Sequence, residues 1–206
     1  GMLYRTLALP CVPAATNVGV FWPRRSMLRK PGLAVVEFLP VIDPGLSVDS
    51  YMERIAAEIE ERSDALMAEA GVHAVANPLI NIMLQGRHDS YPKRRGMTRV
   101  RELRDAGINV AFGADCVMDP WYSLGAADML DVAFMGLHVG QLSSREDMAW
   151  CFDAVTTNAA QALGLSGYGL APGCAANLVL LQAHDKIEAI RLRARRLAVV
   201  RSGRVI

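Results

Sequence analysis

An acidic residue after a short apolar run is the strongest candidate for chemistry in this chain. Asp115 follows the run Ile108 to Phe112, and Cys116, Asp119 and Trp121 come close behind it in the string F-G-A-D-C-V-M-D-P-W-Y. A carboxylate can bind a divalent cation and can take a proton from a metal-bound water. An indole can form one wall of a pocket for a flat aromatic ligand.

The same residues also fit a structural role. Asp115 could cap the turn after the apolar run, and Asp119 with Pro120 could begin a second turn, because Asp side chains accept hydrogen bonds from nearby backbone N–H groups. Spacing alone favours the capping role.

A second candidate cluster is N-P-L-I-N-I followed by L-Q-G-R-H-D-S-Y-P-K-R-R-G. Asn77 and Asn81 could orient a loop near a site, while Gln85, Arg87 and His88 could contact a polar ligand. The alternative is a solvated loop whose Asn and Asp side chains satisfy their own backbone. Composition favours the solvated loop.

The histidines do not form a metal-binding motif. His73, His88, His138 and His184 include no His-x-His or His-Glu-x-x-His pair, and no two are spaced to share a helical face. We expect His73 and His138, which have apolar neighbours, to be buried and hydrogen-bonded. The glycine-rich string at 167–173 precedes a strand-like run, which favours a connecting loop over a phosphate-binding loop.

Hydrophobic periodicity predicts an α/β protein with parallel strands. The segment 49–70 is an amphipathic helix ending at Gly71, and 108–112 is a strand buried on both faces. Strand-like runs are also expected at 8–14, 18–22, 32–39, 72–83 (broken at Asn77-Pro78), 176–181, 197–200 and 205–206, and helices at 98–106, 124–142 and 145–163. The alternation of strands and helices in the middle of the chain indicates an α/β layer.

Size and charge limit the class of partner. The chain has 206 residues, 52% of them hydrophobic, so it can bury a core in one or two domains. Its net charge of +1 gives no global field that would attract nucleic acid or an anionic membrane. A neutral small molecule is the expected partner.

The sequence favours a cytoplasmic protein. No apolar run reaches the roughly 18 residues needed to cross a bilayer. The four cysteines form no C-x-x-C pair, which fits a reducing compartment. Arg5 and the apolar stretch from Leu7 to Ala15 loosely resemble a signal peptide, but Pro10 and Pro13 interrupt the stretch.

Four strings between Val72 and Ile206 resemble the last strands and helices of cytosine-deaminase-like amidohydrolases. They are N-P-L-I-N-I-x-L-Q-G-R-x-D-x-Y-P-K-R-R-G, G-I-N-V-A-F-G-A-D, D-P-W-Y-S-L-G and M-G-L-H-V-G-Q-L, in this order. The tail G-L-A-P-G-C-A-A-N-L-V-L-L resembles the return of such chains to a small accessory β-domain. The resemblance implies the closing part of a (β/α) TIM barrel followed by a short β segment.

The resemblance also implies hydrolytic deamination of cytosine or a related nucleobase at an iron or zinc ion. Asp115 matches the last-strand aspartate that binds the metal and moves protons, and Trp121 matches a tryptophan that lines the pocket. Cys116, where similar enzymes often carry a second Asp, and Gln85 are the further substrate-binding candidates. Ala114 and Met83 replace other polar positions.

The remaining metal ligands of the family, a His-x-His pair and two further histidines, would lie upstream of the matching segment, as would its proton-transferring glutamate. A single carboxylate is too few donors for a catalytic metal, which usually takes three protein ligands. We therefore expect the chain not to retain a metal by itself and to be inactive alone. The alternative is a non-catalytic module that forms homo-oligomers through exposed sheet edges.

Residues 1–70 resemble a different family. The strings L-P-C-V-P-A-A-T-N-V-G-V-F-W-P-R-R, R-K-P-G and F-L-P-V-I-D-P-G-L are similar to the C-terminal part of lysophosphatidic-acid-type acyltransferases, without that family's His-x-x-x-x-Asp. The expected organisation is therefore an acyltransferase-like segment at 1–70 and an amidohydrolase segment at 71–206. Together they suggest a chimaera, and a remnant of acyl transfer is a further alternative function.

Overall fold

The computed structural model describes residues 1–22 and 30–206. The chain divides into two compact units, which are described separately. Unit 1 comprises residues 1–72 and 105–108, and unit 2 comprises residues 73–104 and 109–206. Pro23, Arg24, Arg25 and Arg29, which belong to the acyltransferase-like strings, lie outside the described residues.

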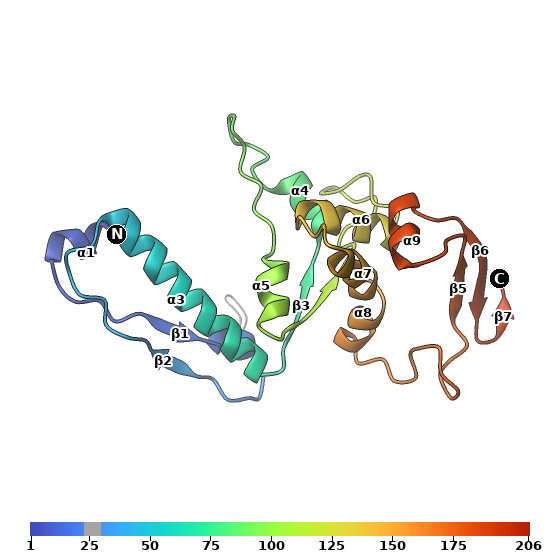
Figure 1. Cartoon of the computed structure of the whole chain (residues 1–206), viewed down its shortest axis with the longest axis horizontal. Coiled ribbons are helices and arrows are strands. Elements are labelled where there is room, and N and C mark those ends of the chain that lie inside the picture. Colours follow the sequence, from blue (N-terminus) through green and yellow to red (C-terminus); the bar gives the residue numbers. More distant parts are fainter. Residues whose placement is uncertain (23–29) are drawn as a thin grey trace. The chain divides into compact units, whose positions relative to one another are not determined.

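Unit 1 is built on one long helix, α3 (Val48–Glu69), which confirms the amphipathic helix expected at 49–70 (Figure 1). The Ser47 hydroxyl begins it by accepting a hydrogen bond from the backbone N–H of Ser50 at 3.1 Å, which satisfies one of the free donors of the first turn. Beside α3 lies a two-stranded antiparallel sheet of β1 (Ala14–Thr16) and β2 (Val36–Phe38).

One apolar cluster of unit 1 lies near the beginning of α3. Tyr51 of α3 stacks on Tyr4 of α1 (Met2–Leu7), with ring centroids 3.8 Å apart, and Ile42 is fully buried beside them. The stacked rings bury a large apolar area, which stabilises this end of the unit. The sequence did not predict α1.

The strand expected at 18–22 is wrong, because Val18–Phe21 form a short helix, α2. The Thr16 hydroxyl accepts a hydrogen bond from the Val18 N–H at 3.0 Å, and the Asn17 carbonyl accepts one from Val20 at 2.9 Å. These local bonds turn the backbone, so they outweigh the β propensity of the valines. The run expected at 8–14 overlaps β1 only at Ala14, and the run expected at 32–39 contains only the short strand β2.

The centre of unit 2 is a pair of parallel strands, as the sequence predicted. β3 (His73–Ala76) pairs with β4 (Asn109–Phe112) in the register His73 to Asn109. Three helices contact β4: α6 (Met129–Val139), α7 (Arg145–Ala154) and α8 (Thr157–Ala162). Phe112 is 2% exposed and meets the Trp150 ring edge-on at 5.6 Å between centroids.

Close packing and paired charges hold the helices of unit 2 together. A Cβ built on Gly136 of α6 would lie 2.4 Å from the Phe112 ring, so α6 approaches β4 as closely as it does only because this residue is glycine. α5 (Val100–Asp105) is joined to α7 by Arg104 and Arg101, whose guanidinium groups lie 2.7 Å and 3.0 Å from the buried carboxylate of Asp147.

Three predicted elements of unit 2 need correction. The second half of the run at 72–83 is a helix, α4 (Pro78–Leu84), because Pro78 at its first position has the backbone angle that a helix start requires. The helix expected at 145–163 breaks between α7 and α8, where the Thr156 hydroxyl donates a hydrogen bond to the Phe152 carbonyl at 2.7 Å. The helix expected at 124–142 begins only at Met129, where Asp128 caps it.

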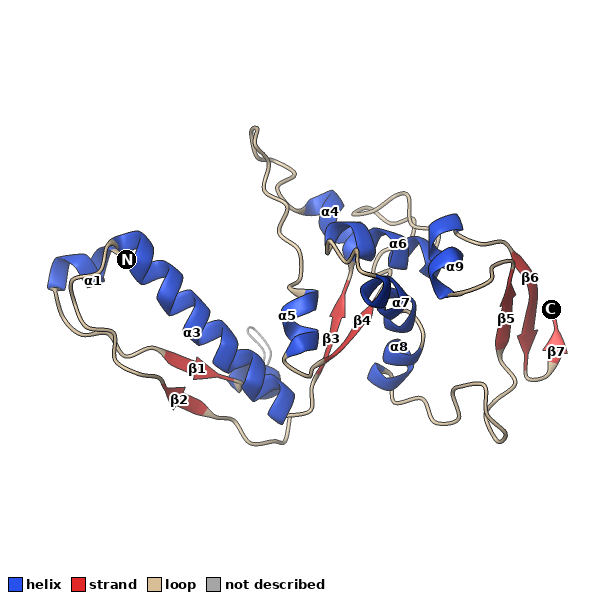
Figure 2. Cartoon of the chain, in the orientation of Figure 1, coloured by secondary structure: helices blue, strands red, loops and turns tan. Residues whose placement is uncertain are grey.

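The C-terminal β segment is present as expected. β5 (Leu178–Leu181), β6 (Arg196–Arg201) and β7 (Arg204–Val205) form an antiparallel sheet, and α9 (Lys186–Leu192) connects the first two strands (Figure 2). Leu181 of β5 packs with Leu130 and Phe152, which joins the sheet to the helices of unit 2. Among the described residues, no helix combines the length and apolarity needed to span a bilayer.

Candidate active site

The carboxyl ends of β3 and β4 meet at one edge of the parallel pair. The Gly113 N–H donates to the Ala76 carbonyl at 2.9 Å, which extends the pairing by one residue beyond β4. A Cβ on Gly113 would lie 2.5 Å from the Asn77 side-chain oxygen, so glycine is required where this amide crosses the end of β4. Asn77 therefore lies against the chain two residues before Asp115, at the edge where the reactive groups of parallel barrels gather.

Asp115 adopts a left-handed backbone conformation, with φ of 59°. The segment between β4 and α6 has no regular structure and contains two more non-glycine residues with positive φ, Met118 and Ala127. Such conformations cost L-residues of order 1 kcal/mol or more and cluster at functional sites, with Asp among the more tolerant residues. The Asp115 side chain is exposed to solvent.

Asp119 forms a turn, which was the alternative to a chemical role in the sequence-based prediction. Its Oδ1 atom accepts hydrogen bonds from the backbone N–H groups of Trp121 and Tyr122, both at 2.9 Å. The Cys116 thiol also bonds to this carboxylate, which lowers the pKa of Asp119. That bond, with burial and the charges of Asp115 and Asp119, raises the pKa of Cys116 to about 11, so the thiol is protonated at neutral pH.

A cavity of about 240 Å³ opens beside this turn. Its walls are largely apolar, and Cys116, Asp131 and Arg193 are among the polar residues that line it. The Arg193 guanidinium lies 4.3 Å from the centre of the Phe134 ring, so its charge rests on an aromatic face. The remaining lining residues are Leu79, Ala114, Tyr122, Leu124, Gly125, Ala126, Ala127, Asp128, Val132 and Met135.

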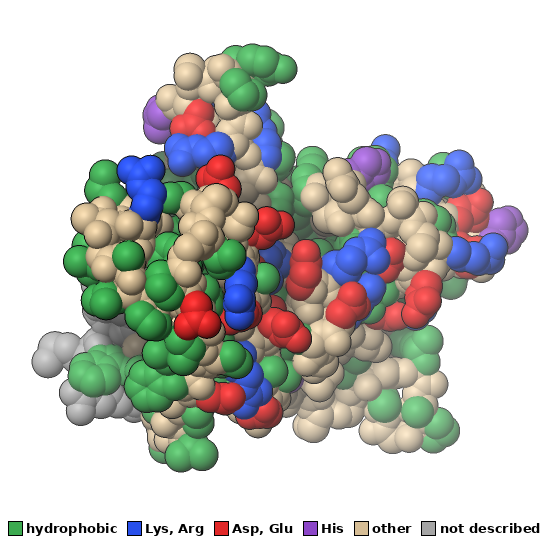
Figure 3. Space-filling model, turned by 60° about the vertical axis from the view of Figure 1, so that its left-hand side comes forward, with side chains coloured by type: hydrophobic (Ala, Val, Ile, Leu, Met, Phe, Trp, Pro, Cys, Tyr) green, Lys and Arg blue, Asp and Glu red, His purple; other side chains and the backbone are tan. Residues whose placement is uncertain are grey.

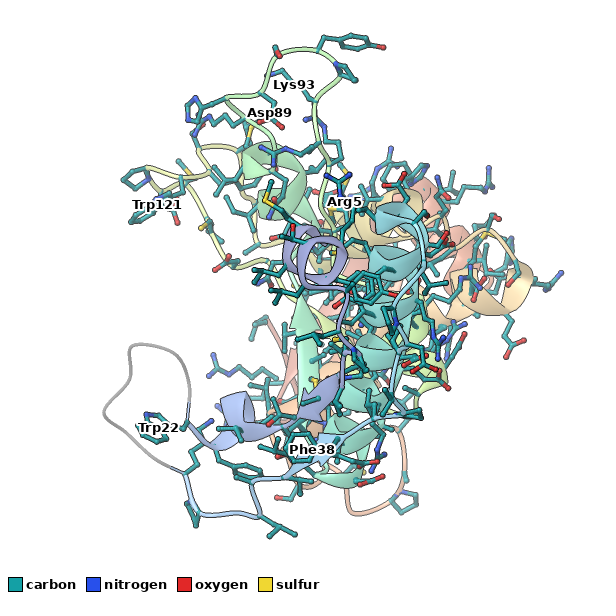
Figure 4. The ribbon with its side chains drawn as sticks, turned by 90° about the vertical axis from the view of Figure 1, so that its left-hand side faces the viewer. Arg5, Trp22, Phe38, Asp89, Lys93 and Trp121 are labelled. Carbon is teal, nitrogen blue, oxygen red and sulfur yellow. The ribbon has the colours of Figure 1, made fainter. Side chains whose placement is uncertain are left out.

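Of the four site residues predicted from the sequence, the structure places only Cys116 in this cavity. Trp121 is 63% exposed and stands away from the ribbon (Figure 4). Gln85 is exposed at the end of α4, where its side-chain oxygen would lie 3.3 Å from a Cβ on Gly96. Two residues of this cavity were not predicted from the sequence: Arg193, which reaches it from the distant end of α9, and Asp131, which lies on α6 and belongs to no motif.

His73 and His138 are exposed, so the burial expected for them is wrong. Both are hydrogen-bonded as expected: His73 Nδ1 lies 3.0 Å from the Asn109 amide nitrogen, and His138 Nδ1 lies 2.7 Å from the Phe134 carbonyl oxygen. Within residues 1–22 and 30–206, no group of three or more His, Cys, Asp or Glu side chains could hold a metal ion. The described donors therefore do not fit a metal centre, for which Asp115 supplies a single carboxylate.

The sequence profile of the amidohydrolase family matches residues 41–206. This chain belongs to the amidohydrolase family. Among curated relatives, the pterin deaminase of Rhizobium rhizogenes is 36% identical over 143 residues, which are 68% of this chain and 32% of that protein. The N-isopropylammelide isopropyl amidohydrolase of Pseudomonas sp. strain ADP is 32% identical over 108 residues, 52% of this chain and 27% of that protein.

Solved structures of amidohydrolases share the fold of this chain over the region that they match. The structure of 5-methylcytosine deaminase from Klebsiella pneumoniae with 5-fluorocytosine is 43% identical, with a TM-score of 0.67, over 77% of this chain and 37% of that chain. N-isopropylammelide isopropylaminohydrolase from Burkholderia multivorans is 30% identical, with a TM-score of 0.63, over 72% and 35% of the two chains. The chain thus spans about a third of the length of the proteins it matches.

The family match changes the interpretation of the first 70 residues. It begins at Val41 and includes α3, which the sequence analysis had assigned to an acyltransferase-like segment. The comparisons give no support to an acyltransferase resemblance or to a chimaera of two families. The boundary expected between residues 70 and 71 stays a prediction.

Proposed function

We propose that this amidohydrolase chain contributes the strand-end aspartate of a deaminase site that acts on cytosine or a related amino-substituted nucleobase. One observation carries the proposal: Asp115 follows the parallel pair β3–β4 at its carboxyl edge, in a left-handed conformation. The 43% identity to a 5-methylcytosine deaminase supports it. The names of the matched proteins suggest planar nitrogen heterocycles as the substrate class.

Asp115 would act as the proton carrier of a hydrolytic deamination. Water attacks the ring carbon that bears the amino group, so that a C–O bond forms, the π electrons of the ring C=N bond move onto the ring nitrogen, and the carboxylate takes one proton from the water. The same carboxyl group returns the proton to the amino nitrogen, the exocyclic C–N bond breaks as the ring nitrogen pair re-forms the ring C=N bond, and ammonia leaves. Its position at the end of a rigid strand pair would hold the carboxylate in one place during both transfers.

The neighbouring side chains would select the ring. Cys116 would border the ring as a neutral thiol whose S–H is held by Asp119, in contrast to the negative charge of an aspartate at this position. Trp121 would have to turn toward the ligand in order to stack on it, and Gln85 would contact it from the end of α4. The cavity beside Cys116 would receive a ring substituent, because its volume is below the roughly 300 Å³ of typical small-molecule pockets.

The test adds the metal-ligating side chains that the described residues do not provide. The chain is co-expressed with the part of the Klebsiella deaminase that its match leaves uncovered, and ammonia release is measured from cytosine, 5-methylcytosine and pterin with zinc or iron(II) added. We expect turnover that falls at least about a hundredfold in Asp115→Asn, the loss typical of a removed acid–base group. The matched control is Glu146→Gln, an exposed acid in the first turn of α7, which should retain full activity.

Undiminished turnover by the Asp115→Asn variant would contradict the assignment. The chain is also assayed alone with each metal. Ammonia release by the chain alone that depends on Asp115 would show that it carries a complete site and would overturn the expectation that it is inactive by itself.

A second candidate function is a non-catalytic module that associates through β3 and β4. Parallel strands are ordinarily covered on both faces, yet Val75 of β3 is 54% exposed. Association through this apolar surface would persist at high salt. A Val75→Lys variant that remains fully associated would contradict it.

A further inference from the structure

The segment between α4 and α5, residues 85–97, forms a braced arm. Asp89 accepts two hydrogen bonds of 2.7 Å from the Arg94 guanidinium, which ties the two limbs of the arm together. At the base, a Cβ on Gly86 would lie 2.1 Å from the Arg94 carbonyl oxygen, so the backbones are in close contact. The ribbon shows the arm standing away from both helices, with Asp89 and Lys93 along it (Figures 1 and 4).

The arm presents an aromatic ring and an excess of positive charge. Tyr91 at its tip is 94% exposed. The arm contains four Lys or Arg residues against one Asp, a net charge of +3 with His88 neutral. Lys93 and Arg87 are exposed and lie together, since the Lys93 amine donates to the Arg87 carbonyl at 2.9 Å. Tyr and Arg dominate binding hot spots, and a braced arm loses little conformational freedom on binding.

The complementary charge lies on α3. This helix carries seven Asp or Glu residues against two Arg, a net charge of −5. Asp49, Glu53 and Glu60 are exposed and recur at intervals of four and seven residues, so they lie on one side of the helix. Ala56 and Ala57 lie between them and leave that side open to an approaching side chain. The space-filling view shows acidic and basic side chains reaching the surface (Figure 3).

We propose that the basic arm of one copy binds the acidic side of α3 in a second copy. The whole chain has a net charge of only +1, whereas the arm carries +3 and α3 carries −5, so the chain carries a charge complement of its own arm. A two-fold dimer would make this contact twice, because each copy offers one arm and one helix. The inference is independent of the deaminase proposal.

The first test is the salt dependence of self-association. The full chain is examined by sedimentation velocity at about 50 mM and about 500 mM NaCl, where screening differs severalfold. We expect a dimer at low salt and a monomer at high salt. Arg87→Glu with Lys93→Glu, or Glu53→Lys with Glu60→Lys, should each weaken dimerisation at least about tenfold at low salt. The matched control, Arg87→Lys with Lys93→Arg, keeps the charges and should dimerise normally.

Mixing the two charge-reversed variants identifies the contact. The arm variant has a net charge of −1 on its arm and keeps the acidic α3, so its two surfaces repel each other. The α3 variant keeps the basic arm and carries two lysines and one aspartate on the binding side of its helix, so its surfaces also repel each other, whereas each surface of one variant attracts its counterpart in the other. We expect an equimolar mixture to form dimers that neither variant forms alone, while circular dichroism shows both to be folded. A monomeric wild-type chain at low salt, or a mixture that stays monomeric, would overturn the proposal. Arm-dependent binding of duplex DNA by a monomeric chain would do so too, and would make nucleic acid the partner.

Discussion

The two small strand pairs of this protein differ in what covers them. In β3–β4 the β4 residues Val110, Ala111 and Phe112 are at most 2% exposed, because α6, α7 and α8 all contact β4, although Val75 of β3 is 54% exposed. In β1–β2 the helix α3 packs against β1, while Val36 and Phe38 of β2 are 56% and 75% exposed. Both pairs are rich in apolar residues, so burial depends on the neighbouring helices and not on the strand sequence.

The difference bears on where a site can be built. A covered strand pair has few alternative arrangements, so a side chain just beyond it is held in a defined place. Asp115 follows the covered pair, and no residue with an assigned chemical role follows the uncovered one. The comparison therefore predicts a rigid, easily damaged centre at β3–β4 and a tolerant surface at β1–β2.

The largest expected effect is the loss of a buried ring. Phe112→Ala removes a side chain that packs on Trp150 and over Gly136, and should lower the free energy of unfolding by about 3–5 kcal/mol. Phe38→Ala removes an exposed ring and should change it by less than about 0.5 kcal/mol. Urea denaturation of both variants measures the difference. Equal effects would mean that the two pairs are covered alike.

A smaller effect is expected from added volume. Gly113→Ala places a methyl group where the Asn77 amide lies and should cost about 1–3 kcal/mol. Adding Asn77→Ala removes the amide and should recover much of that loss. Gly19→Ala in α2 is the control, because nothing lies within 4 Å of its Cβ position. If Gly113→Ala unfolds at the same urea concentration as Gly19→Ala, then Asn77 does not occupy that space.

The smallest expected effect concerns acid stability. The Arg104 guanidinium, with Ser144 and Arg101, lowers the pKa of buried Asp147 from 3.8 to about 2. Folding thus favours the ionised form, so this stabilisation is complete above pH 3.8 and is lost as the pH falls toward 2. It amounts to less than about 2 kcal/mol. In Asp147→Asn, the free energy of unfolding should change less between pH 3.8 and pH 2 than it does in the wild-type protein.

Glu69→Gln in unit 1 is the comparison for that measurement. Arg62 also lowers the pKa of Glu69, but this carboxylate is exposed, so solvent screens the pair. The variant should follow the wild-type curve between pH 5 and pH 2, as judged by thermal melts across the range. An equal flattening in both variants would show that burial does not distinguish the two ion pairs.

The elements that could be predicted are those with long or simple patterns. The helix α3 has several turns of regular apolar spacing, and β4 is a compact apolar run after Gly107, so both were found from sequence. The helices α2 and α4 were missed because their valines and isoleucines suggest strands, while hydrogen bonds at Thr16 and the proline at 78 decide for helix. Such local bonds leave little trace in hydrophobic periodicity.

The candidate site was also predictable only where it depends on a local sequence pattern. Asp115 could be singled out because it follows a strand in the same short string, which is local information. Arg193 could not, because its place beside Phe134 depends on how α9 packs against α6 and not on any nearby motif. The burial expected for His73 was wrong because it is the outward-facing first residue of β3, and apolar neighbours in sequence did not reveal its direction.

The hydrogen bond between Cys116 and Asp119 makes the thiol an unusually weak acid, although it borders a cavity. Alkylating reagents attack the thiolate, and at neutral pH very little of this residue exists in that form. Oxidation to sulfenic acid begins from the same anion and should be suppressed in the same way. The Asp119 carboxylate thus has two roles: it shapes the loop, and it keeps the Cys116 thiol protonated and unreactive.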